Sequence, residues 1–243
     1  MGNIKRTYEG TYTSQMTKET TAVVSSFMSH VYRWMMLGIL ITGVVARVVA
    51  GNQAIMYALL TNKVLFFGLI IAQFAMVIGL SAVLHRLSYL SSIALYLAYS
   101  VLMGITLSVI LFAYTQNSIA SAFFVTAIAF GGLSIVGYFT KVNLGPIGTF
   151  CTMALFGLIG MMLLALFIPS LQGTGAQMLF SIAGIVIFSG LTAYHTQKLK
   201  YFALNANMHS EDGKKLSIQG ALMLYLDFIN LFLSILRLMG SRR

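Results

Sequence analysis

Charged residues are scarce in this chain, and acidic ones are the scarcest. Only 8% of the 243 residues are charged and five are Asp or Glu, whereas 58% are hydrophobic. Soluble domains usually carry about 25% charged residues. This composition excludes a soluble protein and predicts an integral membrane protein, in which spans of roughly 20 apolar residues each leave little room for an extramembrane domain.

Cysteine and proline are nearly absent as well. Cys151 is the only cysteine, so an intramolecular disulfide is excluded and the redox compartment stays undetermined. Two prolines in the whole chain indicate helices that run largely without interruption. Small residues within the apolar runs are expected to let helices approach closely and need no ligand to explain them; they are Gly157, Gly160 and Gly184.

Seven long apolar runs predict seven transmembrane helices. They cover approximately residues 31–50, 64–84, 91–113, 119–140, 147–168, 178–197 and 217–239. The polar, Ser- and Thr-rich segment 1–26 is interpreted as a mobile cytoplasmic tail, and residues 27–243 as a single seven-helix membrane domain. The connections between the runs are short, except for a polar loop from Lys198 to Leu216.

Basic residues are distributed unequally between the two sides of this arrangement. The net charge of +10 does not indicate a nucleic-acid site, because these residues are scattered between apolar runs. If the N-terminus is cytoplasmic, that side collects Lys5, Arg6, Lys18, Arg86, Lys141, Lys198, Lys200, Lys214 and Lys215. The opposite side has mainly Lys63, Arg242 and Arg243. The positive-inside rule therefore favours a cytoplasmic N-terminus and an outside C-terminus; an even span count with a re-entrant last span is the alternative.

Asp227 is the only acidic residue inside the apolar runs, and it lies in the middle of the last one. An ionised carboxylate at membrane depth costs at least about 2.5–3.5 kcal/mol on insertion scales, so it persists where it faces a bundle interior, a partner or a wet path. We therefore interpret Asp227 as part of an ion or proton path. A buried structural ion pair, or a carboxylate that only accepts hydrogen bonds, is the alternative.

Other polar residues share a face of the last helix with Asp227. At about 100° per residue, they fall within a sector roughly 100° wide; they are Gln219, Gly220, Asn230, Ser234 and Arg237. A polar stripe that faces lipid would cost several kcal/mol. The last helix is therefore predicted to be central, or to turn this stripe inward. For Arg237, a position at the far membrane interface is the alternative.

Two further residues are candidates to meet Asp227. His195 ends the sixth run, and the sixth and seventh helices share one loop, so they are expected to be antiparallel neighbours. Arg86, at the end of the second run, is the basic residue best placed to reach a carboxylate from the cytoplasmic side. The alternatives are a solvated interfacial histidine and an arginine that snorkels to headgroups as a topology anchor.

Motifs for enzymatic catalysis are lacking. An intramembrane aspartyl protease needs two carboxylates that share a proton, and only Asp227 is available. Ser189 and His195 lie near opposite faces of one helix, so they do not predict a serine protease. The sequence contains no His-Glu-x-x-His zinc site, phosphate loop or dinucleotide fingerprint. We predict that the chain is not an enzyme and holds no tightly bound cofactor.

Two segments resemble motifs of the transmembrane Bax inhibitor motif family, in particular its bacterial inner-membrane branch. They are residues 221–240, ALMLYLDFINLFLSILRLMG, and residues 190–199, GLTAYHTQKL. The number and spacing of the spans also match, so the resemblance covers nearly the whole chain. It implies an all-α membrane fold in which six helices surround a central C-terminal helix. It also implies an activity as a pH-sensitive calcium leak in the inner membrane.

The resemblance implies roles for three residues. In the family, two aspartates on the sixth and seventh helices share a proton and act as the pH sensor. An arginine on the second helix can bind one of them and latch the path shut. Asp227 matches the seventh-helix aspartate and Arg86 matches the latch. The sixth-helix position holds His195 in the sequence Tyr-His-Thr-Gln, where the family usually has Tyr-Asp-Thr-Gln, so the two-aspartate sensor is absent.

A histidine beside Asp227 differs in its effects from a second carboxylate. Two nearby aspartates repel, which is how a shared proton arises, whereas histidine and aspartate stabilise each other's charged forms. Calcium prefers several oxygen ligands, so it should bind only weakly at Asp227. Our hypothesis is that protonated His195 takes over part of the latch role, holding Asp227 as an ion pair at low pH and releasing it as the pH rises.

The alternative function is a non-conducting membrane interaction protein that modulates a membrane protease or a stress or cell-death response. Some family members are described in this way, and the loss of one aspartate favours it. The Ser- and Thr-rich tail would be the contact segment. The expected partners are therefore the lipid bilayer and other membrane proteins such as a protease, and not nucleic acid; calcium would be a permeant ion.

Overall fold

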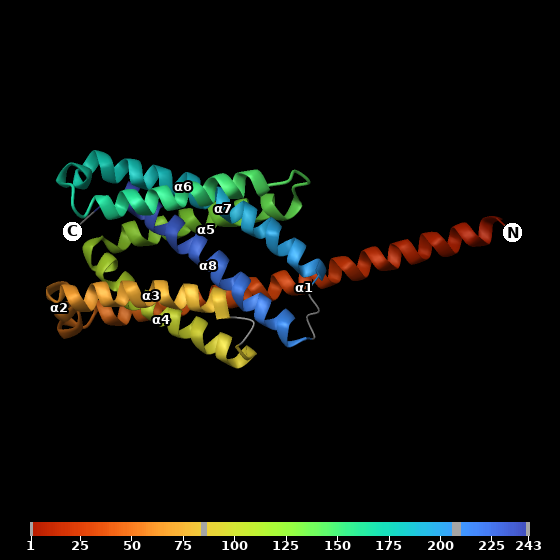
Figure 1. The fold of residues 1–243 in the computed structure, drawn as a ribbon, viewed down its shortest axis with the longest axis horizontal. Coiled ribbons are helices and arrows are strands. Elements are labelled where there is room, and N and C mark those ends of the chain that lie inside the picture. Colours follow the sequence, from red (N-terminus) through yellow and green to blue (C-terminus); the bar gives the residue numbers. More distant parts are fainter. Residues whose placement is uncertain (1, 84–86, 206–209, 242–243) are drawn as a thin grey trace.

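The computed structural model is a bundle of helices (Figure 1). It describes residues 2–83, 87–205 and 210–241. These residues contain no β-strand, and the predicted all-α membrane fold is confirmed. The helices are α1 (Gly2–Ala50), α2 (Gln53–Thr61), α3 (Lys63–Val83), α4 (Tyr89–Ala113), α5 (Gln116–Phe139), α6 (Gly145–Leu164), the short 3-10 helix η2 (Pro169–Gln172), α7 (Thr174–Asn205) and α8 (Glu211–Met239).

The second predicted span, residues 64–84, corresponds to α3, which forms a bent pair with the preceding helix α2. Within the described residues, six helices are long and apolar enough to cross a membrane, and the pair Gln53–Thr61 and Lys63–Gly79, bent by 89°, makes a seventh if it is one span. Asn62 lies at the bend, where its side chain accepts a hydrogen bond from the backbone N–H of Leu65 at the start of α3. An asparagine that caps the next helix in this way favours a break between two helices.

Helix α2 and the ends of α7 and α8 correct the predicted connections. The segment from Asn52 to Lys63 was predicted to be a loop, but it contains α2, whose first turn is capped by the Asn52 side chain. The polar loop predicted from Lys198 to Leu216 is largely helical, because α7 runs on to Asn205 and α8 begins at Glu211. Hydropathy marks the apolar part of a helix, whereas caps such as Asn52 decide where the helix begins.

The predicted tail, residues 1–26, is helical from Gly2 onward and continues into the bundle as α1. With 49 residues, α1 is about 74 Å long at 1.5 Å per residue, more than twice the thickness of a hydrocarbon core. Its N-terminal part extends away from the other helices (Figure 1). Among the side chains whose burial the structure describes, the first buried ones are Val24 and Phe27, close to the predicted start of the membrane domain.

Helix α8 is the most enclosed span. In the described structure, 61% of its apolar window is buried, a larger share than in any other candidate span. Helices α1, α4, α5 and α7 pack directly against it, while α3 packs mainly on α4 and α6 mainly on α7. The C-terminal helix is therefore central, as predicted, although the peripheral helices reach it chiefly through their neighbours.

Glycines permit close contact at some of the expected positions only. A side chain at Gly184 would overlap the hydroxyl of Ser234 on α8, so this glycine does allow close approach. Gly157 and Gly160 have no neighbouring atom within 4 Å of the position that a Cβ would occupy, so the expectation was wrong for them. Both lie on α6, which packs mainly on α7 at the edge of the bundle.

Candidate functional site: a buried histidine–aspartate pair

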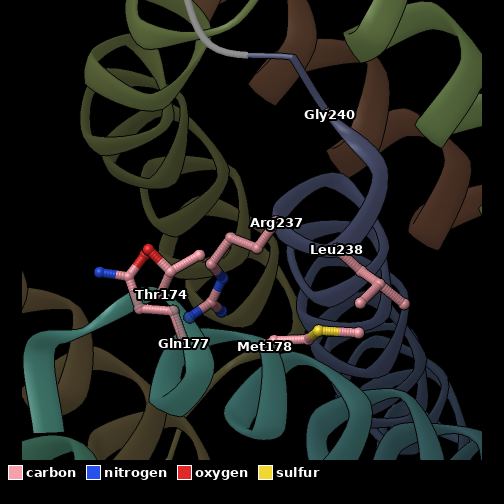
Figure 2. A pocket seen from close by; sticks show the side chains of 6 residues that line it. All are labelled: Thr174, Gln177, Met178, Arg237, Leu238 and Gly240. Atoms are coloured by element: carbon pink, nitrogen blue, oxygen red, sulfur yellow. The ribbon is translucent and has the colours of Figure 1, made fainter.

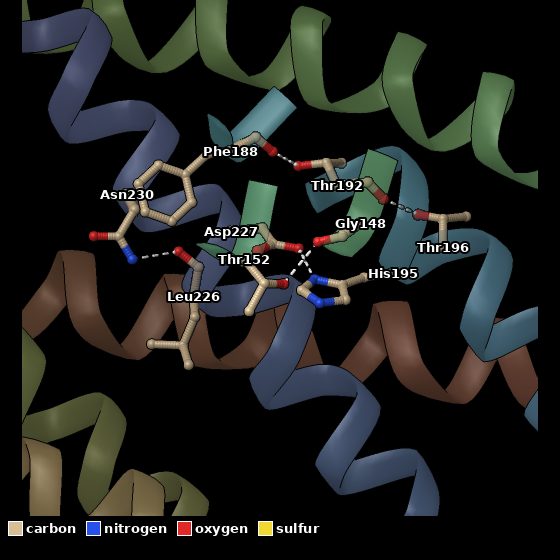
Figure 3. Close-up of polar contacts among 9 residues, drawn as sticks. All are labelled: Gly148, Thr152, Phe188, Thr192, His195, Thr196, Leu226, Asp227 and Asn230. Carbon is tan, nitrogen blue, oxygen red and sulfur yellow. Dashed lines mark hydrogen bonds and ion pairs between the residues drawn. The ribbon is translucent and has the colours of Figure 1, made fainter. Parts of the chain in front are cut away.

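Asp227 lies in the middle of α8 and is only 3% exposed. Nδ1 of His195, on the neighbouring helix α7, lies 2.6 Å from Oδ2 of Asp227 (Figure 3). The structure thus brings together the two residues that the sequence placed on adjacent helices. A buried charge needs a partner with which it can form hydrogen bonds, and His195 supplies that partner.

Neighbouring hydroxyl groups take no part in this contact. Thr192 and Thr196, one turn away from each other on α7, donate hydrogen bonds to the carbonyl oxygens of Phe188 and Thr192 (Figure 3). Among the described residues, no other hydrogen bond to the side chain of Asp227 or His195 is present. The site is therefore a two-residue contact whose strength depends on the protonation state of one imidazole.

Helix α6 covers this part of α7 at close range. A side chain at Gly148 would overlap the ring of Tyr194, which in turn lies 5.3 Å from the His195 ring, measured between centroids. Thr152, one turn further along α6, donates its hydroxyl to the carbonyl oxygen of Gly148. The His195 side chain keeps 16% of its surface exposed, so it retains limited access from outside the bundle.

Gln197, in the same motif, has a structural role that the sequence did not reveal. Its Oε1 accepts a hydrogen bond from the backbone N–H of Leu144, and its Nε2 donates one to the carbonyl of Val142, each at 2.8 Å. Lys200 donates to the carbonyl of Tyr138, near the end of α5, also at 2.8 Å. Both residues attach α7 to the end of α5 and the connection that follows it. A glutamine beside a run of apolar residues is the signal that could have indicated this role.

A second group of polar contacts lies on another face of α8. The hydroxyls of Tyr225 and Thr42 are 2.6 Å apart, and Thr42 donates its proton to the carbonyl of Ser100 at 2.8 Å, so Tyr225 is the donor to Thr42. The rings of Tyr96 and Tyr99 pack edge-on against Tyr225. Residues 225 and 227 are about 200° apart around a helix, so α8 is held by polar contacts on two nearly opposite faces.

The remaining residues of the predicted polar stripe do not extend the site. Asn230 and Ser234 donate their side-chain hydrogen bonds to carbonyl oxygens of α8 itself, those of Leu226 and Asn230. Arg237 is exposed near the end of the helix and Gln219 is half-buried. The polar stripe therefore faces the interior of the bundle along the middle of α8, and its last residue, Arg237, is exposed. The predicted latch residue, Arg86, lies outside the described residues.

The pair by itself is a poor calcium site. It offers one carboxylate and one imidazole, whereas calcium takes six to eight oxygen ligands. Within the part of the chain that the structure describes, no group of three or more His, Cys, Asp and Glu side chains could hold a metal ion.

Comparison with known proteins connects this site to a family. The family model described as inhibitor of apoptosis-promoting Bax1 matches residues 24–243, which include every span and the His195–Asp227 pair. The chain belongs to the Bax inhibitor family. The match begins at the residue where the buried core of the bundle begins, Val24.

Relatives in several bacteria match this Bax inhibitor family protein over nearly its full length. It is 45% identical over 223 residues to the inner membrane protein YbhL of Escherichia coli strain K12, covering 91% of this chain and 94% of that protein. An uncharacterized protein of Borreliella burgdorferi is 38% identical over 226 residues, 93% and 96% of the two chains. The uncharacterized protein YrjE of Lactococcus lactis is 36% identical over 219 residues, 89% and 91% of the two chains.

Proposed function

We propose that this protein is a gated leak pathway for cations, calcium among them, and that the His195–Asp227 pair is its pH-responsive gate. The observation that carries the proposal is the 2.6 Å contact between a buried carboxylate and an imidazole on the most enclosed helix of the bundle. In this proposal the protein is not an enzyme and binds no cofactor tightly.

The bacterial inner membrane is the proposed location, with the N-terminus in the cytoplasm. The name of the Escherichia coli relative, an inner membrane protein, supports the membrane, and the distribution of Lys and Arg supports the orientation. In this orientation His195 lies toward the cytoplasmic end of α7, so the gate would respond to the pH of the cytoplasm.

Protonation of His195 is the proposed switch. Histidine changes charge near physiological pH, and a hydrogen bond between two charged groups is roughly twice as strong as one between neutral groups. When His195 is protonated, it holds Asp227 as an ion pair and no carboxylate is free for a cation. When His195 loses its proton, the contact weakens and Asp227 can attract a cation, so conduction rises with pH.

Calcium flux into liposomes, measured across a range of pH, tests this function. We expect wild-type flux to rise with pH, Asp227→Asn to reduce it to near the level of empty liposomes, and His195→Asp to change its pH profile. Ser234→Ala is the matched control, because Ser234 is buried on the same helix but bonds only to its own backbone. Identical pH profiles for wild type and His195→Asp would rule out the proposed switch, and flux unchanged by Asp227→Asn would make that residue structural.

The alternative is an interaction protein that modulates another membrane protein, such as a protease, without conducting ions. The part of α1 that extends beyond the bundle favours this alternative as a contact segment (Figure 1), and so does the single carboxylate of the site. Flux no greater than in empty liposomes, together with a partner recovered after mild crosslinking, would support it over the leak pathway.

A further inference from the structure

A pocket of about 310 Å³ lies between the start of α7 and the end of α8 (Figure 2). It is at the end of the bundle opposite the connection between these two helices, and so it is separate from the His195–Asp227 pair in the middle of α8. The residues that line it are Thr174, Gln177, Met178, Arg237, Leu238 and Gly240.

Arg237 gives this pocket a positive charge, and it takes part in no ion pair with another described side chain. Figure 2 shows its side chain extending from α8 toward Thr174 and Gln177 of α7. Its Nε donates to the carbonyl of Leu233 at 3.2 Å. Within the described residues, the ion pairs are His195 with Asp227 and Lys215 with Asp212, so neither involves Arg237.

The rest of the pocket has two kinds of surface. Thr174 supplies a hydroxyl that can donate a hydrogen bond to an anion, whereas the amide of Gln177 donates to the carbonyl of Gln172 at 2.9 Å and lines the pocket as a polar wall. Met178 and Leu238 are apolar and exposed, 55% and 41% respectively. Because the pocket lies where two apolar spans end, it is at the depth of the phospholipid headgroups, just outside a hydrocarbon core of about 30 Å.

We propose that this pocket binds the phosphate of an anionic phospholipid headgroup. Arg237 neutralises the phosphate, the hydroxyl of Thr174 on α7 orients it, and the first part of an acyl chain lies against Met178 and Leu238. An arginine that only snorkels to bulk headgroups needs no cavity and no second helix. Here the cation and the hydroxyl come from different helices and line one space, so a bound headgroup connects the ends of α7 and α8.

Native mass spectrometry of the purified protein in neutral detergent, titrated with phosphatidylglycerol or phosphatidylcholine, tests this site. Both lipids carry an ionised phosphate, but the trimethylammonium of phosphatidylcholine brings a second positive charge close to Arg237. We therefore expect the wild type to prefer phosphatidylglycerol by about tenfold. Arg237→Gln should remove the preference.

Arg47→Gln is the matched control and should keep the preference, because Arg47 is exposed in the last turn of α1 and does not line the pocket. Val31 of α1 lies next to Gly220 of α8, and Thr42 lies next to Tyr225, so the two helices run parallel. Arg47, near the end of α1, therefore lies at the same end of the bundle as Arg237, near the end of α8.

A second variant keeps the proposal testable if Arg237→Gln does not fold. Thr174→Asp places a carboxylate on the first residue of α7, where negative charge suits the helix, and gives Arg237 an internal partner. It should abolish the lipid preference while circular dichroism and melting temperature stay as in the wild type. Preference for phosphatidylglycerol that survives in the folded variants would overturn the proposal.

Inorganic phosphate distinguishes a lipid from a free anion. Added to the wild type in neutral micelles, it should leave the melting temperature unchanged, because it has no acyl chain to lie against Met178 and Leu238. A rise in melting temperature with phosphate that Arg237→Gln abolishes would assign the pocket to a free anion and overturn the lipid proposal.

Discussion

Gln197 shows how one side chain can determine a connection between helices. Its amide satisfies the N–H of Leu144 and the C=O of Val142, two backbone groups that follow α5. A buried polar group that loses its partner costs about 1–3 kcal/mol. The role of Gln197 is therefore structural, although it lies two residues from His195 in the motif that carries the family resemblance.

Replacing Gln197 should destabilise the protein. We expect Gln197→Ala to lower the free energy of unfolding by about 1–3 kcal/mol, because it leaves a buried N–H and a C=O unpaired. Thermal unfolding in detergent, followed by circular dichroism, measures this change. Gln53→Ala, at an exposed position of α2, should change it by less than about 0.5 kcal/mol. Equal effects of the two variants would contradict the assigned role.

The hydroxyl contacts of Tyr225 and Thr42 predict an order of stability. Tyr225→Phe removes one neutral hydrogen bond and should cost about 1 kcal/mol. Thr42→Val should cost more, because it loses the bond to the carbonyl of Ser100 and also leaves the Tyr225 hydroxyl without its acceptor. The melting temperatures of the two variants measure these costs. A lower melting temperature for Tyr225→Phe than for Thr42→Val would contradict the assignment of Tyr225 as the donor to Thr42.

The pair at the centre of the site was predictable at the residue scale, whereas its surroundings were not. Asp227 is conspicuous because it is acidic among apolar residues, and His195 because a single loop joins its helix to the last one. Gln197 and Tyr225 find their partners 53 and 183 residues away in the sequence. Such contacts depend on tertiary packing, which neither hydropathy nor helical periodicity encodes.

At the scale of the element, glycines distinguish central helices from peripheral ones. A side chain at Gly137 of α5 would overlap the backbone of Ala193 on α7, which cannot move aside as a side chain can. Gly157 of α6 has open space around it. The sequence alone did not separate these cases, because all glycines in apolar runs have the same pattern.

Alanine substitutions at these two glycines should have opposite effects on stability. Gly137→Ala should destabilise the protein by about 1–3 kcal/mol, as overpacking does, because it separates α5 from α7. Gly157→Ala should be neutral or stabilising by up to about 1 kcal/mol, because alanine favours the helix. Thermal unfolding in the same detergent tests both, and similar losses would contradict the peripheral position of α6.

Helix boundaries were less predictable than helix existence. Six of the predicted apolar runs correspond to candidate spans, and the second corresponds to α3, the longer helix of the bent pair. The break at Asn62 and the extension of α7 to Asn205 follow from capping and from contacts such as that of Lys200 with Tyr138. These interactions lie outside the apolar windows on which span prediction depends.

At the scale of the whole molecule, the bundle and the N-terminal extension are separable parts. Among the side chains that the structure describes, the first buried ones are Val24 and Phe27, and the family match begins at residue 24. We therefore expect removal of residues 2–20 to leave the melting temperature unchanged, and with it any calcium flux of the kind proposed above. If the protein also binds a partner through this segment, the truncation should abolish crosslinking to it. A large fall in melting temperature would mean that the segment belongs to the folded domain.

The two polar attachments of α8 differ in one respect that matters for movement. Under the proposed function, the contact between Asp227 and His195 responds to protons, whereas the one between Tyr225 and Thr42 joins two neutral hydroxyls. A rise in pH would then release α8 on one face only. The contact on the opposite face would persist, so α8 would move while it stays attached at residue 225.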